Sequence, residues 1–252
     1  MKKKKKATSR PKTEKKIKVK KTRTVAKAAE KVSSDVARIS LIAGDNFYEI
    51  AQVRAEGREE NLVKAIGAYN RALSFYAFKD YPYNYGETQE NLGNAYRSLS
   101  EVRDKEENLG LAVKAYKRAL DVYTSDAFPV QYAVTQNNLG NAYRNLAGVR
   151  DKEKKLELAI NAYKEALRVY TPGAFPINYA GTTFNVGHLC LAMAGMYSKK
   201  GDKEQEMESF KQAETAYAES LKLFKKERIT EWVEEAEKHL ASVRRFIEQI
   251  KE

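Results

Sequence analysis

The chain has 252 residues, of which 32% are charged and 42% apolar, and a net charge of +12 at neutral pH. Its mean hydropathy is −0.66, and no apolar run approaches the ~20 residues of a membrane-spanning helix, so we expect a soluble protein. The single cysteine, Cys190, and only two histidines exclude a disulfide scaffold and argue against a zinc enzyme.

The positive charge is concentrated at the N-terminus. Residues 1–24 contain 13 Lys and Arg and one acidic residue, whereas residues 25–252 contain 33 of each sign. Because this segment has few apolar residues and no aromatic one, we expect a disordered basic tail over residues 1–24. Such a tail suits a polyanion (nucleic acid, acidic protein or anionic lipid), and a solubilising extension or a targeting signal is the open alternative. The candidate anion-binding residues are Lys2, Lys3, Lys4, Lys5, Lys6, Arg10, Lys12, Lys15, Lys16, Lys18, Lys20, Lys21 and Arg23.

The tail also bears on localisation. A secretory signal needs an apolar run of ~7 to 15 residues after its positive start, and none follows Lys6. We therefore expect a cytoplasmic protein, or a nuclear one if the cell is eukaryotic.

A 47-residue repeat organises the rest of the chain. The hexapeptide Asn-Leu-Gly-Asn-Ala-Tyr at residues 91–96 returns unchanged at 138–143 and in weakened form at 185–190. A second motif, Ala-(Ile/Val)-x-Ala-Tyr-x-x-Ala-Leu, keeps the same step. It occupies residues 65–73, 112–120 and 159–167.

Each repeat is predicted to be a pair of helices. Apolar residues fall at i, i+3, i+4 and i+7, the pattern of an amphipathic helix, and no stretch alternates as a strand would. In the first full copy we expect one helix from Pro82 over about 21 residues, ~30 Å long, and a second from Asn108, as its cap, to near Tyr123. Gly93 is expected to face Ala112 and Ala119, which would let the two helices approach closely, and Tyr96 and Tyr116 are expected to fill the neighbouring gaps.

These motifs resemble the tetratricopeptide repeat (TPR), whose signature is Leu-Gly-x-x-Tyr in the first helix and Ala-x-x-x-Phe/Tyr in the second. The matching residues lie at 92–96 and 112–116, and again one period later. Two features depart from the family pattern. Thirteen residues are added to the usual 34, and Gln89, Gln136 and Thr183 stand where the family has a signature tryptophan.

The resemblance covers about residues 45–224 and implies an all-α, right-handed α-solenoid. A degenerate first helix is expected at about 35–56. Apolar residues from Trp232 to Ile250 form one stripe, which predicts a terminal capping helix after a candidate cap at Thr230. The resulting helical domain would span residues 25–252, with about four helix pairs at 35–78, 82–124, 129–171 and 176–226 and a capping helix at 230–251.

The resemblance also implies a surface, lined by the first helices, that holds a peptide or a helix of a partner protein. The residues it assigns to this surface in the first two full copies are Asn94, Arg97, Asn137, Asn141 and Arg144. Asparagine can bond a peptide unit and arginine a carboxylate, so this set suits an extended acidic segment. Solvated surface residues without a ligand are the alternative interpretation.

In the third copy the equivalent positions change character to Phe184 and His188. They could form a pocket for a ligand side chain or simply pack against the longer second helix. Asn91 and its equivalents at 138 and 185 are expected to be structural, bonding polar groups between repeats.

No catalytic, phosphate-binding, dinucleotide or metal-binding motif is present, so we expect neither an enzyme nor a cofactor. We predict a TPR-type adaptor that binds a partner protein on its concave face, its basic arm contacting an anionic surface. The alternative is a nucleic-acid-associated protein, of chromatin or ribosome, that binds non-specifically through the tail. A third hypothesis, end-to-end assembly of the chain, is disfavoured by the charged face of the 230–251 helix.

Overall fold

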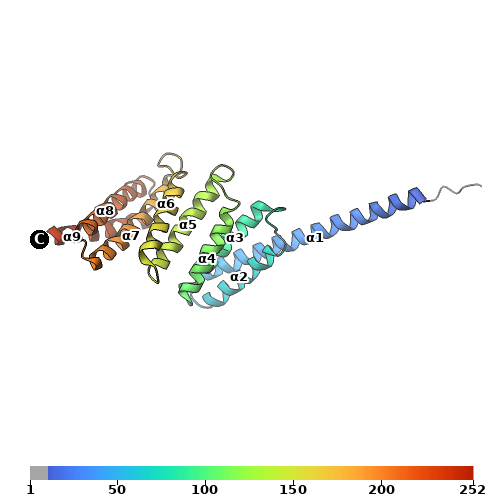
Figure 1. Cartoon of the computed structure of the whole chain (residues 1–252), viewed down its shortest axis with the longest axis horizontal. Coiled ribbons are helices and arrows are strands. Elements are labelled where there is room, and N and C mark those ends of the chain that lie inside the picture. Colours follow the sequence, from blue (N-terminus) through green and yellow to red (C-terminus); the bar gives the residue numbers. More distant parts are fainter. Residues whose placement is uncertain (1–10, 252) are drawn as a thin grey trace, which may run out of the picture.

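The computed structural model describes the backbone of residues 11–251 and the side chains of residues 31–250, and this part of the chain is helical with no strand. Figure 1 shows the helices in their order along the molecule. They are α1 (Pro11–Val53), α2 (Arg58–Leu73), α3 (Pro82–Leu99), α4 (Lys105–Leu120), α5 (Pro129–Ala147), α6 (Lys152–Leu167), α7 (Pro176–Lys200), α8 (Lys203–Lys226) and α9 (Thr230–Lys251).

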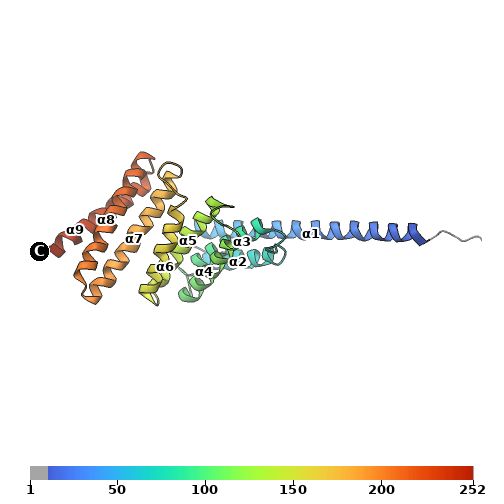
Figure 2. The same cartoon turned by 45° about the horizontal axis from the view of Figure 1, so that its top comes forward.

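The helices pack in chain order. α1 with α2, α3 with α4, α5 with α6 and α7 with α8 form hairpins, each hairpin packs on the next, and α9 packs on α8. Figure 2 shows the resulting row of helices, with the first half of α1 projecting beyond it. The predicted all-helical class and the pairing of helices are confirmed.

Proline sets the start of the first helix in three pairs. Pro82, Pro129 and Pro176 each occupy the first helical position, where the missing N–H removes no intrahelical bond. α3 ends at Leu99, a few residues before the predicted end. The chain then turns through Asp104, which has a left-handed backbone with φ of 45°.

The predicted cap of α4 is wrong. α4 begins at Lys105, so Asn108 lies inside its first turn. Asn108 is 5% exposed and its Nδ2 donates a 2.9 Å hydrogen bond to the carbonyl oxygen of Arg103. The asparagine therefore closes the turn between the two helices instead of capping the second.

The atoms nearest to Gly93 on the facing helix belong to the ring of Tyr116. A Cβ added at Gly93 would lie 2.6 Å from a ring atom of Tyr116, so only a glycine lets the ring lie flat against the first helix. The same contact recurs in the other pairs at similar distances. The pairs are Gly44 with Tyr69, Gly140 with Tyr163 and Gly187 with Tyr217.

α1 is much longer than the predicted 35–56 helix. It begins at Pro11, so residues 11–24 of the expected disordered tail are helical, and residues 1–10 lie outside the described residues. Lysine, arginine, alanine and glutamate have high helix propensity, and extending a helix already held by tertiary contacts costs far less than nucleating one. The expectation of disorder over residues 1–24 was based on their low apolar content and did not consider their helix propensity.

The last hairpin is also longer than the others. In the sequence, the Ala-Tyr-x-x-Ala-Leu of residues 162–167 is echoed at 216–221, a step of 54 residues that predicts an insertion of about two helical turns. α7 has 25 residues and α8 has 24, against 16 for α4 and α6. α9 begins at the predicted Thr230 and buries one apolar stripe against α7 and α8. Ala236, Leu240, Val243 and Ile247 form this stripe, each less than 9% exposed.

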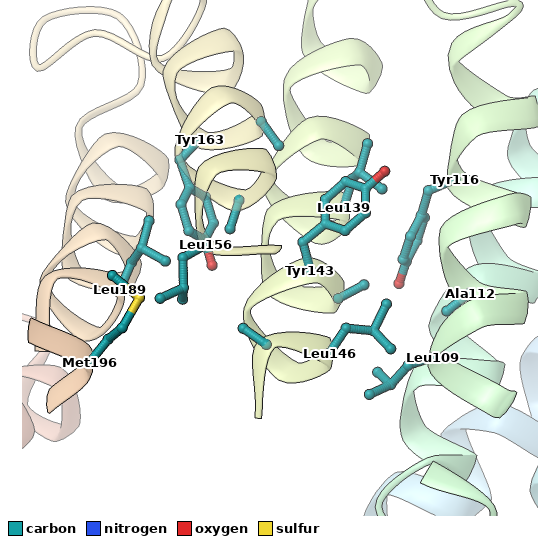
Figure 3. Close-up of a cluster of buried hydrophobic side chains, with 14 residues drawn as sticks. Leu109, Ala112, Tyr116, Leu139, Tyr143, Leu146, Leu156, Tyr163, Leu189 and Met196 are labelled. Atoms are coloured by element: carbon teal, nitrogen blue, oxygen red, sulfur yellow. The ribbon is translucent and has the colours of Figure 1, made fainter. Parts of the chain in front are cut away.

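The core runs between the hairpins as a series of leucine and tyrosine contacts. Figure 3 shows Tyr116 and Tyr163 on either side of α5, with Leu139 and Leu146 between the helices. Tyr116 and Tyr163 are 0% exposed, so each hairpin shares its apolar surface with its neighbours.

Candidate ligand-binding face

The predicted ligand-binding residues lie on equivalent positions of the first helices. Together with four further residues on the same side of α1 and α3, they make up what we call the first-helix face. Successive members on one helix are three or four residues apart, which places them on a single side of it. The face consists of Asp45 and Tyr48 on α1, Glu87, Glu90, Asn94 and Arg97 on α3, Asn137, Asn141 and Arg144 on α5, and Phe184 and His188 on α7.

Asn94 and Asn141 are partly occupied inside their own hairpins. The hydroxyl of Tyr116 donates a 2.8 Å hydrogen bond to Asn94 Oδ1, and Tyr163 donates an equally short one to Asn141 Oδ1. Each tyrosine is buried, so its hydroxyl needs this acceptor. The amide NH₂ of each asparagine and the second lone pair of its Oδ1 remain for a ligand, and peptide binding by these residues stays a prediction.

The end hairpins carry the same bond with other acceptors. Tyr69 donates to Asp45 Oδ1 at 2.9 Å, and the hydroxyl of Tyr217 lies 2.9 Å from His188 Nδ1. The partner of the tyrosine hydroxyl thus changes from carboxylate to amide to imidazole along the chain, while the tyrosine stays the same. The repeated Ala-x-x-x-Tyr motif marked the tyrosines in the sequence, but no pattern identified their acceptors.

Asparagines also join neighbouring hairpins. Asn91 Nδ2 donates to Asp45 Oδ1 at 2.9 Å, and Asn185 Nδ2 donates to Asn137 Oδ1 at 3.2 Å. These bonds agree with a structural role for the asparagines at 91 and 185. They also show that Asn137, predicted to bind a ligand, is itself part of the α5–α7 contact.

Arg97 and Arg144 have hydrogen-bonding capacity that the fold does not use. The Nε of each is buried without a hydrogen-bond partner among the described residues. Arg97 Nη1 lies 3.8 Å from Glu101 Oε1. One period later the position of Glu101 is Gly148, so Arg144 has no carboxylate one turn further along its helix.

The two guanidinium groups act on the same buried hydroxyl. Burial raises the pKa of Tyr163, and the positive charges of Arg144 and Arg97 oppose that rise. Arg144 also opposes the rise in the pKa of Tyr217. The arginine charge is therefore centred on α3 and α5, in the middle of the face.

Glu90 adds an acidic group that no sequence pattern singled out. Burial raises the pKa of Glu90 to about 7, helped by the charge of Glu87 and opposed by a hydrogen bond from Thr135. That bond joins Thr135 Oγ1 on α5 to Glu90 Oε2 at 3.2 Å. The face thus combines two arginines with a carboxyl that is partly protonated near neutral pH.

Phe184 and His188 both contact the last helices, which agrees with the packing alternative, and their role in ligand binding stays a prediction. Phe184 is 3% exposed, and its ring centroid lies 5.7 Å from those of Trp232 and His239 on α9. The His188 and His239 rings are 4.6 Å apart. Burial and then the charge of Arg144 lower the pKa of His188 to about 4, so it is neutral at physiological pH.

The lone cysteine and the possible metal ligands were the remaining candidates for chemistry. Cys190 is buried, which raises the pKa of its thiol to about 11. Among the described residues no three His, Cys, Asp or Glu side chains are grouped so that they could hold a metal ion. Nor does any helix there combine the length and apolar character needed to cross a membrane.

The predicted anion-binding tail is described only in part. Residues 2–6 and Arg10 lie outside the described residues. The basic residues from Lys12 to Arg23 belong to α1, but the structure describes only their backbone.

Comparison with known proteins does not assign the chain to a family. No family model matches the sequence, and no curated protein does. Among solved structures, the crystal structure of BtubC (BKLC) from P. vanneervenii is 15% identical in sequence over 87% of this chain and 92% of that chain, with a TM-score of 0.34. A TM-score at that level does not establish a shared fold, so the function has to be argued from the site itself.

Proposed function

We propose that the chain is a TPR-like protein-interaction adaptor, built as a right-handed α-solenoid, and that its first-helix face binds an acidic peptide segment of a partner protein. The solenoid is supported by the 47-residue step in sequence and by the order of packing. The recurring glycine–tyrosine contact supports the TPR-like pairing. A binding role, without catalysis, agrees with a buried thiol and a neutral, packed histidine.

Arg144 is the observation that carries this proposal. Its Nε is buried without a partner in the part of the chain that the structure describes, and a buried donor left without an acceptor costs about 1–3 kcal/mol. A carboxylate can accept two parallel bonds from a guanidinium, which is stronger and more directional than a neutral bond. The amide groups of Asn94 and Asn141, which keep two donors each, can bond the backbone of the same segment.

The test begins with selection of random displayed peptides on the full-length protein. We expect the selected peptides to be enriched in Asp and Glu. In a fluorescence-anisotropy titration of one such peptide, Arg144→Leu should weaken binding at least ~10-fold, because a charge-assisted bond is worth about 1.5–3 kcal/mol. Leucine is a suitable replacement because α7 already carries Leu191 at this position.

Arg168→Gln is the matched control. Arg168 is 69% exposed in its side chain and pairs with Glu165 at the end of α6, away from the first-helix face, so its loss removes the same charge without touching the proposed site. Equal binding by wild type and Arg144→Leu, or selected peptides that lack carboxylates, would contradict the proposal. Asn141→Ala is unsuitable because it leaves the buried hydroxyl of Tyr163 without its acceptor.

A second candidate function is polyanion binding through α1. It is favoured by the unbroken course of α1 from Pro11, which carries seven of the tail's basic residues on one helix projecting from the body (Figure 1). Binding of this kind should weaken with salt, by about 0.9 log units per log unit of salt for each phosphate contacted. A titration of duplex DNA at two salt concentrations measures this binding. Arg144→Leu should leave DNA binding through α1 unchanged, because it affects only the proposed peptide site.

A further inference from the structure

A pocket of about 470 Å³ lies between α6, α7 and α8. That volume is within the range of sites for small ligands. The residues that form its α7 wall are three or four positions apart and therefore lie on one side of the helix. They are Tyr179, Thr183, Val186 and Cys190. At ~100° per residue, Phe184 and His188 point roughly 150° away from this wall, so the pocket is separate from the first-helix face.

The pocket lies where the third copy of the repeat carries smaller side chains than the second copy. Each of three residues of the α7 wall is smaller than the residue one period before it. Thr183, Val186 and Cys190 replace Gln136, Leu139 and Tyr143. All three losses of volume are on the same side of α7, so they leave one connected space.

The frame around these three positions is unchanged between the two copies. The hydroxyl of Tyr179 donates a 2.7 Å hydrogen bond to Glu219 Oε1 on α8. In the second copy Tyr132 donates an equally short bond to Glu165 Oε2 on α6. The two hairpins are therefore built alike at this place, and they differ in the side chains that fill it.

The largest difference is the missing tyrosine ring at Cys190. The first and second full copies have Tyr96 and Tyr143 at this position. The ring of Tyr143 lies toward the second helix of its own hairpin, with Lys155 Nζ 5.8 Å from the ring centroid. The thiol of Cys190 points the same way, with Sγ 3.9 Å from Gln212 Oε1 on α8. A ring that enters from outside would thus take the place that the repeat fills with its own tyrosine.

One polar group of the pocket is buried without a partner. Thr183 is 6% exposed, and its Oγ1 has no hydrogen-bond partner among the described residues. Such a hydroxyl can donate a hydrogen bond to a ligand hydroxyl or accept one from it. The walls on either side of it include the apolar side chains of Leu167, Val186 and Ala216. Apolar walls with one unused hydroxyl suit an aromatic ring that carries an OH group.

We propose that this pocket binds a phenol ring, seated beside Cys190 and hydrogen-bonded through its OH group to Thr183. Free phenols and tyrosine side chains share this chemistry. The pocket has no residue in common with the first-helix face, so the inference does not depend on the acidic-peptide proposal.

A nuclear magnetic resonance titration of the full-length protein with p-cresol tests the pocket. p-Cresol should shift the signals of pocket residues on α7 and α8. It should bind at least ~5-fold more tightly than toluene, which lacks only the hydroxyl, the fold-change expected for one neutral hydrogen bond. Thr183→Val keeps the shape of the side chain and should remove this difference. N-acetyl-tyrosinamide distinguishes the sources: tighter binding than that of p-cresol assigns the ring to a tyrosine of a peptide, and weaker binding assigns it to a free phenol.

Cys190→Tyr restores the ring of the other copies and should fill the pocket. We expect it to weaken p-cresol binding at least ~10-fold with an unchanged circular dichroism spectrum. Cys190→Ala is the matched control, because it leaves the space open and should bind p-cresol as the wild type does.

A second readout needs no variant. Bound p-cresol should slow the alkylation of Cys190, the single cysteine of the chain, by iodoacetamide. The proposal would be overturned by a wild type that does not bind p-cresol, by undiminished binding in a folded Cys190→Tyr variant, or by equal binding of toluene and p-cresol.

Discussion

Glycine at the helix crossing is the residue on which each hairpin depends most directly. At Gly93 a Cβ would meet the Tyr116 ring at 2.6 Å, and Tyr116 is fully buried with its hydroxyl fixed by Asn94. The ring therefore cannot move aside without losing a hydrogen bond and its packing. Gly110, on α4, has no neighbouring atom within 4 Å of the position that a Cβ would take, and it serves as an internal reference.

We predict opposite effects for the two substitutions. Gly93→Ala should lower the free energy of unfolding by about 1–3 kcal/mol, the usual cost of overpacking. Gly110→Ala should raise it by about 0.5–1 kcal/mol, because alanine loses less backbone entropy in a helix. Urea unfolding followed by circular dichroism measures both, and a neutral Gly93→Ala would show that the ring shifts freely.

His188 gives the molecule a pH dependence of known sign. Its pKa is about 4 in the folded protein, against 6.5 for a free histidine. As pH falls below 6.5 the unfolded chain binds a proton that the folded chain does not, so stability falls until pH reaches about 4. Glu90 acts in the opposite direction: its folded pKa is about 7 against 4.5, so its contribution rises as pH falls from 7 to 4.5.

His188→Asn isolates the histidine from the other titrating groups. Asparagine already accepts the tyrosine hydroxyl at positions 94 and 141, so the bond from Tyr217 can be kept. We predict that the variant is as stable as wild type at pH 7 and gains about 1–2 kcal/mol over it at about pH 4, after allowance for partial solvent exposure. Urea unfolding at both pH values measures the difference, and parallel curves for the two proteins would contradict the prediction.

At the scale of the residue, the sequence could identify the tyrosines and glycines but not their partners. The period places Gly93 and Tyr116 on facing helices, but how closely the ring approaches the glycine depends on a rotation of the helices that no spacing determines. Phe184 was assigned to the face by its register. Its burial depends on α9, which comes about 50 residues later in the chain and keeps no repeat register.

At the scale of the element, helix starts were predictable where a residue imposes them. Pro82, Pro129 and Pro176 fix φ and lack an N–H, so each begins a helix. The starts of α4 and α6 were not predictable in this way. They follow Asp104 and Asp151, whose φ values of 45° and 48° are left-handed, and an aspartate is a poor indicator of that conformation.

Charged side chains tie these turns together at successive hairpins. Arg103 pairs with Glu59 and Arg150 with Glu106, each at 2.8 Å, and Lys200 pairs with Glu153 at 2.7 Å. The three glutamates and the two arginines are spaced by the 47-residue period, so their equivalence is visible in the sequence, whereas Lys200 comes 50 residues after Arg150 and does not keep the period. Because the side chains are exposed, each ion pair contributes about 0–1 kcal/mol to stability. We therefore expect the three pairs to orient neighbouring hairpins more than to stabilise them.

At the scale of the whole molecule, each hairpin contacts mainly its neighbours in the chain. In such a one-dimensional arrangement stability is a sum of local terms and nearest-neighbour contacts, and a defect at one end should not reach the other. Leu240 on α9 (7% exposed) and Leu62 on α2 (0% exposed) are buried leucines near the two ends. Their truncation to alanine creates a matched pair of defects.

We predict that Leu240→Ala lowers amide-exchange protection in α7, α8 and α9 and leaves α1 to α4 unchanged, and that Leu62→Ala does the reverse. Each change should cost about 2–5 kcal/mol locally, the usual penalty for removing a buried leucine side chain. Hydrogen exchange read by mass spectrometry resolves the two ends of the chain. A uniform loss of protection in either variant would show that the chain unfolds as one cooperative unit, because the shared tyrosine and leucine contacts would then couple every hairpin to all the others.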